Sequence, residues 1–209
     1  MNTHFSTSRQ AGVLLILGFT FFAAHLFTIF VLGNWPWTVF LVLLYGLALF
    51  LFSVSIKHVF NHSESKSIDY IARAFGAHGI LVIIVCSLIM AHFKIIEEFP
   101  DISKNDPVSS VLWFAMDKIR TGSFIFLGVG TVALGYSWIQ TGSHRWLGIP
   151  GIAIGSIVCI DFLIVLMDAV AEPTIQPLVF ISISLGLIYL LVVGGTLVGF
   201  KGLKNKLHE

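Results

Sequence analysis

The stretch WLGIPGIAIGSIVCIDFLIVLMDAVAE, residues 146–172, decides the fold of this chain. It is apolar for more than the roughly 20 residues that a helix needs to cross the hydrocarbon core of a bilayer. Two acids, Asp161 and Asp168, nevertheless lie inside it. Because a carboxylate at membrane depth is costly, each of them is a candidate for a functional site.

Small residues occupy a different face of the same stretch. Gly148, Gly151 and Gly155 recur at helical spacing, about 120° around the helix from the two acids. Small residues let membrane helices approach closely, so we expect this face to pack against a neighbouring helix. Gly194, Gly195 and Gly199 form a second such face near the C-terminus, for packing inside the bundle or against another copy of the chain.

Five further runs are long and apolar enough to span a bilayer. The six runs lie near residues 11–33, 37–59, 70–95, 121–141, 146–170 and 175–200. Backbone groups in lipid must be paired internally, and the runs lack the period-2 alternation of barrel strands, so helices are predicted. Short connections make sequential helices neighbours. The predicted fold is therefore all-α, a polytopic membrane bundle of six transmembrane helices that forms a single domain, 1–209.

Composition agrees with a membrane protein. The chain is 56% hydrophobic and 11% charged, whereas soluble domains are about 25% charged. A net charge of +1 without a basic stripe excludes a nucleic-acid partner, so the lipid bilayer is the expected one. Cys86 and Cys159 lie in separate apolar runs and predict packing residues rather than a redox motif. The first run is too long for the core of a cleavable signal, so we expect a retained span.

Lysine and arginine residues predict the orientation. Eight of the 12 fall on the side of the two termini, and the other four share their side with five acids. Because basic residues concentrate in cytoplasmic loops, both termini are predicted to lie in the cytoplasm.

The connection after the third span is the only long one. Asp106 can cap a helix that Pro107 begins, and apolar residues recur at helical spacing up to Ile119. Residues 107–120 are therefore predicted as a helical segment in the outer interface, or equally as an N-terminal extension of the fourth span.

Three histidines join the acids of the fifth span as candidates for a ligand or proton cleft. His25 and Asp161 lie about 21 and 22 Å from the inner ends of their spans, so they can meet if their helices are neighbours. His92 and Asp168 lie at the outer rim, and His78 stands alone in the inner third of its span. Two interpretations stay open: a polar cleft with Asp161 and His25 at its floor, or an Asp161 that is satisfied by one helix partner.

Two histidine patterns raise the question of a metal or a haem. His58 and His62 are four residues apart, the spacing of two ligands on one helical face, but they lack further ligands nearby. His78 and His92 share a face at a spacing similar to that of haem-binding histidines, yet a second helix offers only His25. No cofactor is therefore expected, with haem b as the alternative.

Residues 124–164 carry a family resemblance. The segment contains Leu134–Gly135–Tyr136, Thr141–Gly142, Arg145, Leu147–Gly148–Ile149 and then Asp161. This pattern resembles a broad family of uncharacterised bacterial integral membrane proteins with six spans. The resemblance implies the same fold and a place in the bacterial inner (plasma) membrane, and it implies no activity.

Three classes of function remain open. The leading hypothesis is a membrane protein that binds or passes a small solute or a proton through an outward-opening polar cleft. The alternatives are a non-catalytic structural or assembly subunit of a membrane complex, and a haem- or metal-dependent oxidoreductase that uses the histidines above. No nucleophile motif or phosphate-binding loop is present, so an enzyme is not favoured.

Overall fold

The computed structural model describes residues 3–32, 35–59, 66–98, 107–142, 145–167 and 172–204. All regular structure in these ranges is helical, and no strand occurs in them. The helices are α1 (Thr3–Phe27), α2 (Trp35–Val59), α3 (Lys66–Glu98), α4 (Pro107–Thr141), α5 (Arg145–Leu166) and α6 (Glu172–Lys204). A π-helical turn, Thr28–Leu32, continues α1.

Each of the six helices contains an apolar segment long enough to cross a membrane. The predicted all-α fold with six such helices is therefore confirmed. Within the described ranges, α5 is the shortest helix with 22 residues and α4 the longest with 35. Helices of these lengths extend over about 33 and 53 Å, against about 30 Å of hydrocarbon in a bilayer.

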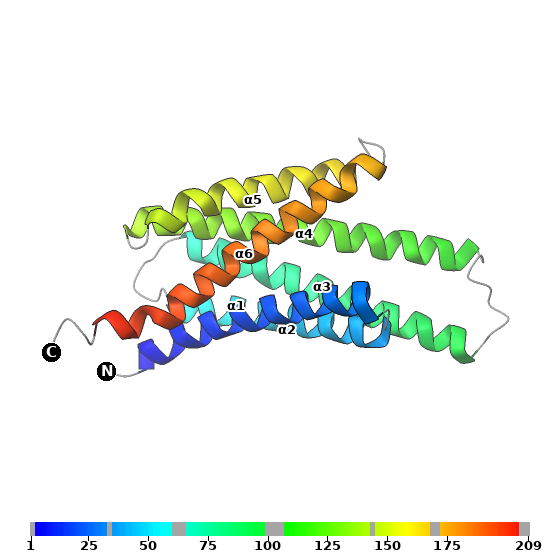
Figure 1. Ribbon diagram of the computed structural model, residues 1–209, viewed down its shortest axis with the longest axis horizontal. Helices are drawn as coiled ribbons and strands as arrows, with labels where there is room; N and C mark the ends of the chain where they lie inside the picture. The colour runs from blue at the N-terminus through cyan, green and yellow to red at the C-terminus, as the bar shows by residue number, and fades with distance from the viewer. Residues whose placement is uncertain are drawn as a thin grey trace.

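The helices form a closed ring in chain order. Each helix packs against the next one along the sequence, and α6 returns to pack against α1. In Figure 1, α6 crosses the molecule diagonally, from the neighbourhood of α1 to the opposite end of α5. One continuous apolar core lies within this ring, and its most deeply buried members include Leu15, Phe52, Phe75, Leu134 and Val193.

The chain begins and ends at the same end of the bundle (Figure 1). We call this the termini end and the opposite one the far end. An even number of antiparallel helices explains this arrangement, because each pair returns the chain to its starting side. The cytoplasmic location of this end stays a prediction.

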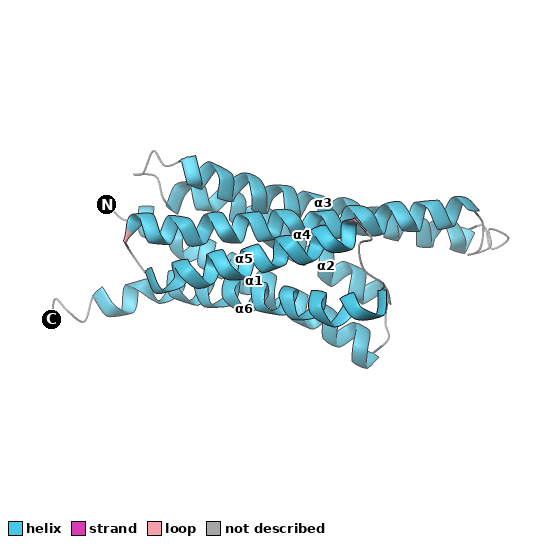
Figure 2. Cartoon of the chain, turned by 90° about the horizontal axis from the view of Figure 1, so that it is seen from above, coloured by secondary structure: helices cyan, strands magenta, loops and turns pink. Residues whose placement is uncertain are grey.

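Helices α3 and α4 project beyond the others at the far end (Figures 1 and 2). Residues 107–120 are the first part of the continuous helix α4, so they form no separate interfacial helix. Of the two alternatives for this segment, the structure has the extension. In this part of α4, Met116 is almost fully buried and Trp113 contacts His92 of α3, whereas Val111 and Phe114 are exposed.

Gly142 ends the fourth helix. Its φ of 69° lies in the left-handed region, which a glycine adopts without strain. Its backbone N–H donates to the carbonyl of Ile139, as expected at a helix C-terminus. The chain then turns, and α5 runs back along α4 from Arg145.

Candidate functional site

His78 lies at the centre of a fully buried hydrogen-bonded group that joins three helices. Its side chain is 0% exposed. Its Nδ1 lies 2.8 Å from the carbonyl oxygen of Ser123 on α4, and its Nε2 lies 2.8 Å from the hydroxyl of Tyr45 on α2. In a neutral imidazole one nitrogen donates and the other accepts. Nδ1–H therefore donates to the Ser123 carbonyl, and the Tyr45 hydroxyl donates to Nε2. The sequence suggested that His78 stands alone, but the structure gives it a partner on each of two neighbouring helices.

A layer of aromatic rings surrounds this group. The ring of Phe22 on α1 lies 5.0 Å from that of Tyr45, and Tyr45 lies edge-on to His78 at 5.6 Å. His78 lies 5.2 Å from Phe124 on α4, which stacks on Phe162 of α5 at 4.6 Å. Five successive helices thus contribute one ring each to a single layer of the core.

Asp161 continues this layer toward α6. It is the neighbour of Phe162 in the sequence of α5. Its carboxylate accepts a hydrogen bond from the hydroxyl of Ser182 on α6. Ser182 is buried, whereas Asp161 is half-buried. Among the described residues, no lysine or arginine forms an ion pair with Asp161. The acid is therefore joined to a neutral partner at the seam between two helices.

His25 does not meet Asp161. Helices α1 and α5 make no contact in the described part of the chain, because α6 and α2 flank α1 in the ring. His25 is half-buried, its Nδ1 lies 3.2 Å from the carbonyl oxygen of Thr38 on α2, and its ring contacts that of Phe22. The pairing of His25 with Asp161 at the floor of one cleft is therefore corrected: each residue has a different partner on an adjacent helix.

His92 lies between α3 and α4 near the far end. Its ring is 4% exposed and meets Trp113 edge-on at 5.4 Å. Within the described residues its Nε2 is buried without a hydrogen-bond partner. His92 thus differs from His78, whose two nitrogens are both bonded, although the two histidines lie on the same helix.

The remaining polar candidates are outside the described residues. Asp168 and His62 fall in gaps between the described ranges. His58 belongs to the last turn of α2, but its side chain is not among those described. The predicted position of Asp168 at the rim and the predicted pair of His58 and His62 therefore lie outside the described side chains, whereas the other rim residue, His92, is buried.

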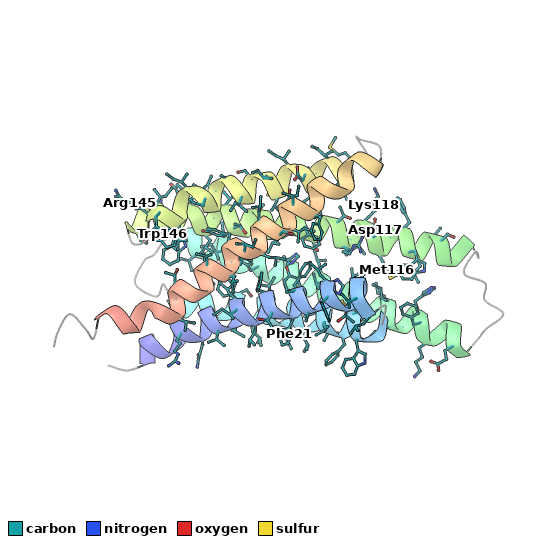
Figure 3. The ribbon with its side chains drawn as sticks, viewed as in Figure 1. Phe21, Met116, Asp117, Lys118, Arg145 and Trp146 are labelled. Atoms are coloured by element: carbon teal, nitrogen blue, oxygen red, sulfur yellow. The ribbon has the colours of Figure 1, made fainter. Side chains whose placement is uncertain are left out.

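Charged side chains gather near the helix ends. Asp117 and Lys118 lie on the far half of α4, and Arg145 lies at the termini end of α5 (Figure 3). Asp117 accepts a hydrogen bond from Arg120 at 2.5 Å in an exposed ion pair, and the ammonium of Lys118 lies 5.3 Å from the ring of Phe114. The three charged residues of α4 lie within its candidate membrane span, Ser110–Thr141, and Arg145 is the first residue of α5.

The glycine face of α5 packs directly on α4. A Cβ atom at Gly155 would lie 2.7 Å from the carbonyl oxygen of Gly128, and one at Gly135 would lie 2.6 Å from that of Gly148. A Cβ atom at Gly151 would lie 2.9 Å from the Cα of Gly135. The two backbones are therefore in contact, and no side chain fits between them. Asp161 meets α6, and so does one edge of the glycine face, since a Cβ atom at Gly151 would also lie 2.7 Å from Cζ of Tyr189.

The small-residue face predicted for Gly194, Gly195 and Gly199 packs inside the bundle only at Gly194. A Cβ atom at the facing Gly12 of α1 would lie 2.7 Å from the Gly194 carbonyl oxygen. Gly195 and Gly199 are exposed, and a Cβ atom at either would meet nothing within 4 Å. Consecutive helical residues differ by about 100° in direction, so Gly195 points away from the α1–α6 seam.

The described residues contain no group of three or more histidine, cysteine or acidic side chains that could hold a metal ion. A haem between His25 and His78 does not fit the geometry of His78, since both of its nitrogens are hydrogen-bonded within the core. The histidines therefore offer no set of free ligands in this part of the chain.

Sequence reasoning missed the partners of these polar groups. Tyr45 lies in the middle of an apolar run, and its hydroxyl at that depth needs a partner for the same reason as a buried acid. The hydroxyl of Tyr189 on α6 donates to the carbonyl of Leu147 at 3.1 Å. Ser182 carries no comparable signal, because serine is common in the packing of membrane helices.

Comparison of the chain with family models, with curated proteins and with solved structures finds no match. The family resemblance of residues 124–164 therefore stays a prediction, and the arrangement of the site has to be interpreted from its own geometry.

Proposed function

We propose that this chain is a multi-pass protein of a bacterial plasma membrane with both termini in the cytoplasm. Six apolar helices of sufficient length and a common end for the two termini support this proposal. The excess of lysine and arginine on the side of the termini supports the orientation.

We further propose that the protein binds or passes a proton or a small cationic solute at Asp161. What supports this is the pair of Asp161 and Ser182. In lipid, a charged carboxylate is costly, and one neutral hydroxyl compensates for only part of that cost. Asp161 is half-buried and has no cationic partner among the described residues, so a proton or a cationic group from outside the protein is the missing partner.

The composition of this pair narrows the class of ligand. Divalent cations such as Ca²⁺ and Mg²⁺ take about six or more oxygen ligands. The described residues provide one carboxylate and one hydroxyl here. Two polar groups suit a proton, or a solute that presents a single ammonium group. The phenyl rings of the neighbouring layer, above all Phe162, give the site an apolar wall.

The test uses purified protein in liposomes. A hydrophobic carbodiimide modifies carboxyl groups in apolar surroundings, and we expect it to label Asp161, as read by peptide mass spectrometry. Asp161→Asn should remove the label together with any proton or solute flux that the wild-type protein carries. Asp117→Asn is the matched control, since it neutralises an exposed acid, and it should leave both readouts unchanged. An Asp161→Asn protein that is folded and fully active would refute the proposal.

A structural or assembly role is the second candidate. It is favoured by the hydrogen bonds of His78, which satisfy both of its nitrogens inside the core and leave them unavailable to a ligand. In that case Asp161 and Ser182 serve only to join α5 and α6. Crosslinking in native membranes would then recover a stable partner protein, and liposomes would show no solute or proton response in either the wild type or Asp161→Asn.

A further inference from the structure

Helix α6 is firmly held in the half nearer the termini end. The side chain of Tyr189 occupies a notch over Gly151, where a Cβ atom would lie 2.7 Å from its Cζ, and its hydroxyl donates to the carbonyl of Leu147. A few residues further on, the backbone of Gly194 touches that of Gly12 on α1. This half of α6 is therefore fixed on both of its neighbours in the ring.

The other half of α6 is held more loosely. At Gly186 a Cβ atom would have ordinary van der Waals contact with Val158, at 3.5 Å, so the backbones are not in contact there. Ser182 then joins Asp161. Around Ser182, the apolar side chains of Phe180, Ile181 and Leu185 are exposed on the same helix. In the described residues, the hydrogen bond of Ser182 is the polar link of this half to α5.

We infer that the Asp161–Ser182 hydrogen bond is a latch that controls access to Asp161. When the bond breaks, the far half of α6 moves away from α5 about the fixed contact of Tyr189 with Gly151. This inference rests on the proposed function, because a proton or an ammonium group that binds Oδ2 of Asp161 displaces the Ser182 hydroxyl from that oxygen. Ligand exchange and the release of α6 are then one event.

The strength of such a bond suits a latch. Hydrogen bonds between membrane helices contribute little on average, so breaking one shifts a two-state population by about threefold. The close contacts of Tyr189 with Gly151 and of Gly194 with Gly12 have no such alternative, since closely packed interiors do not deform continuously. Movement is therefore confined to the part of α6 between Gly186 and the far end of the bundle.

Distances between spin labels test the latch in the full chain in liposomes. In a background with Cys86→Ala and Cys159→Ala, one pair of labels replaces the exposed Leu163 and Ile181, which lie on the two sides of the latch. A control pair replaces Ile149 and Val192 in the fixed half. Ser182→Ala should raise the population of long distances about threefold for the first pair and leave the second pair unchanged.

Ser182→Thr keeps a hydroxyl and should restore the wild-type distances, which separates the latch from a general defect in folding. Equal distance distributions in Ser182→Ala and the wild type would overturn the latch. A change of the same size in both pairs would also overturn it, because the helix would then move as a whole.

Carbodiimide labelling of Asp161 in the same samples distinguishes this inference from the proposed function. Faster labelling in Ser182→Ala supports both. Labelling of Asp161 without any change of distance refutes the latch and leaves the proposed function standing. A change of distance without labelling at Asp161 supports the latch as a structural link and refutes the proposed function.

Discussion

The two faces of α5 show two ways to join apolar helices. Toward α4, Gly135 and Gly155 bring the backbones into contact, and no side chain lies between them. Toward α6, Asp161 and Tyr189 provide hydrogen bonds across a wider gap. The contact of α5 with α4 depends on close fit, so the two backbones have only one way to pack. The contact of α5 with α6 depends on polar groups that can exchange partners, so only this contact is suited to a functional movement.

The largest loss of stability should come from a substitution in the glycine seam, the contact of the α5 glycines with α4. In Gly155→Val the new side chain meets the carbonyl of Gly128 and the backbone nitrogen of Val132, each 2.7 Å from the Cβ position. These are backbone atoms of α4, which cannot move away unless the whole helix shifts. We therefore expect a loss of about 3 kcal/mol in the free energy of unfolding. Unfolding in mixed detergent micelles measures it.

Gly195→Val is the matched control, with the same change of residue on a surface where a Cβ atom meets nothing within 4 Å. Its effect should stay within about 0.5 kcal/mol. Equal losses in the two variants would mean that the α4–α5 contact is not the reason for the glycine at position 155.

The second-largest loss of stability should come from removing His78 from its buried hydrogen-bonded group. His78→Leu leaves the Tyr45 hydroxyl without its acceptor in a dry core, and we expect a loss of about 2 kcal/mol in the same unfolding assay. His92→Leu removes a histidine that is as deeply buried but whose Nε2 has no described partner, so it should be neutral or slightly stabilising. If both substitutions cost the same, hydrogen bonding would not distinguish the two histidines.

Substitutions at the hydrogen bonds between α5 and α6 should lower the free energy of unfolding less than those at Gly155 or His78. Tyr189→Phe and Ser182→Ala each remove one hydrogen bond between helices, and we expect a loss of about 0.6 kcal/mol for each. The comparison of the two faces of α5 predicts this order, and a loss at Ser182 as large as that in Gly155→Val would contradict it.

The exposed ion pair should have the smallest effect. Arg120 and Asp117 lie one helical turn apart on α4 with both side chains more than half exposed to solvent. Asp117→Asn should change the free energy of unfolding by about 0.5 kcal/mol or less, and the change should vanish at high salt. A larger effect would indicate that this part of α4 contributes to the core.

The helices were predictable because lipid leaves the backbone few alternatives. Six apolar runs of about 20 residues correspond to six helices, and the spacing of the glycines around Gly151 correctly indicates a packing face. The length of α4 was ambiguous, because Val111 and Met116 recur with a period that suits both an interfacial helix and an extended span. Contact with α3 decides between the two, and such contact is not visible in a single helix.

The site was less predictable, since depth along a helix says nothing of which helices are neighbours. His25 and Asp161 have similar depths, yet the ring places α6 between their helices. The second glycine face was only partly correct for a related reason. Gly194 and Gly195 are adjacent in the sequence, and only the direction of α1 determines which of them lies in the seam.

The ring has a consequence for how the chain can be cut and rejoined. Since α6 packs against α1, the present termini are one of several places at which the ring can be opened. A chain that joins α6 to α1 by a flexible linker and begins instead at Arg145, after the turn at Gly142, would preserve every seam between helices and return its new ends to the same end of the bundle. Such a permuted protein should fold, with its first hairpin formed by the polar seam of α5 and α6 and its glycine seam closed last.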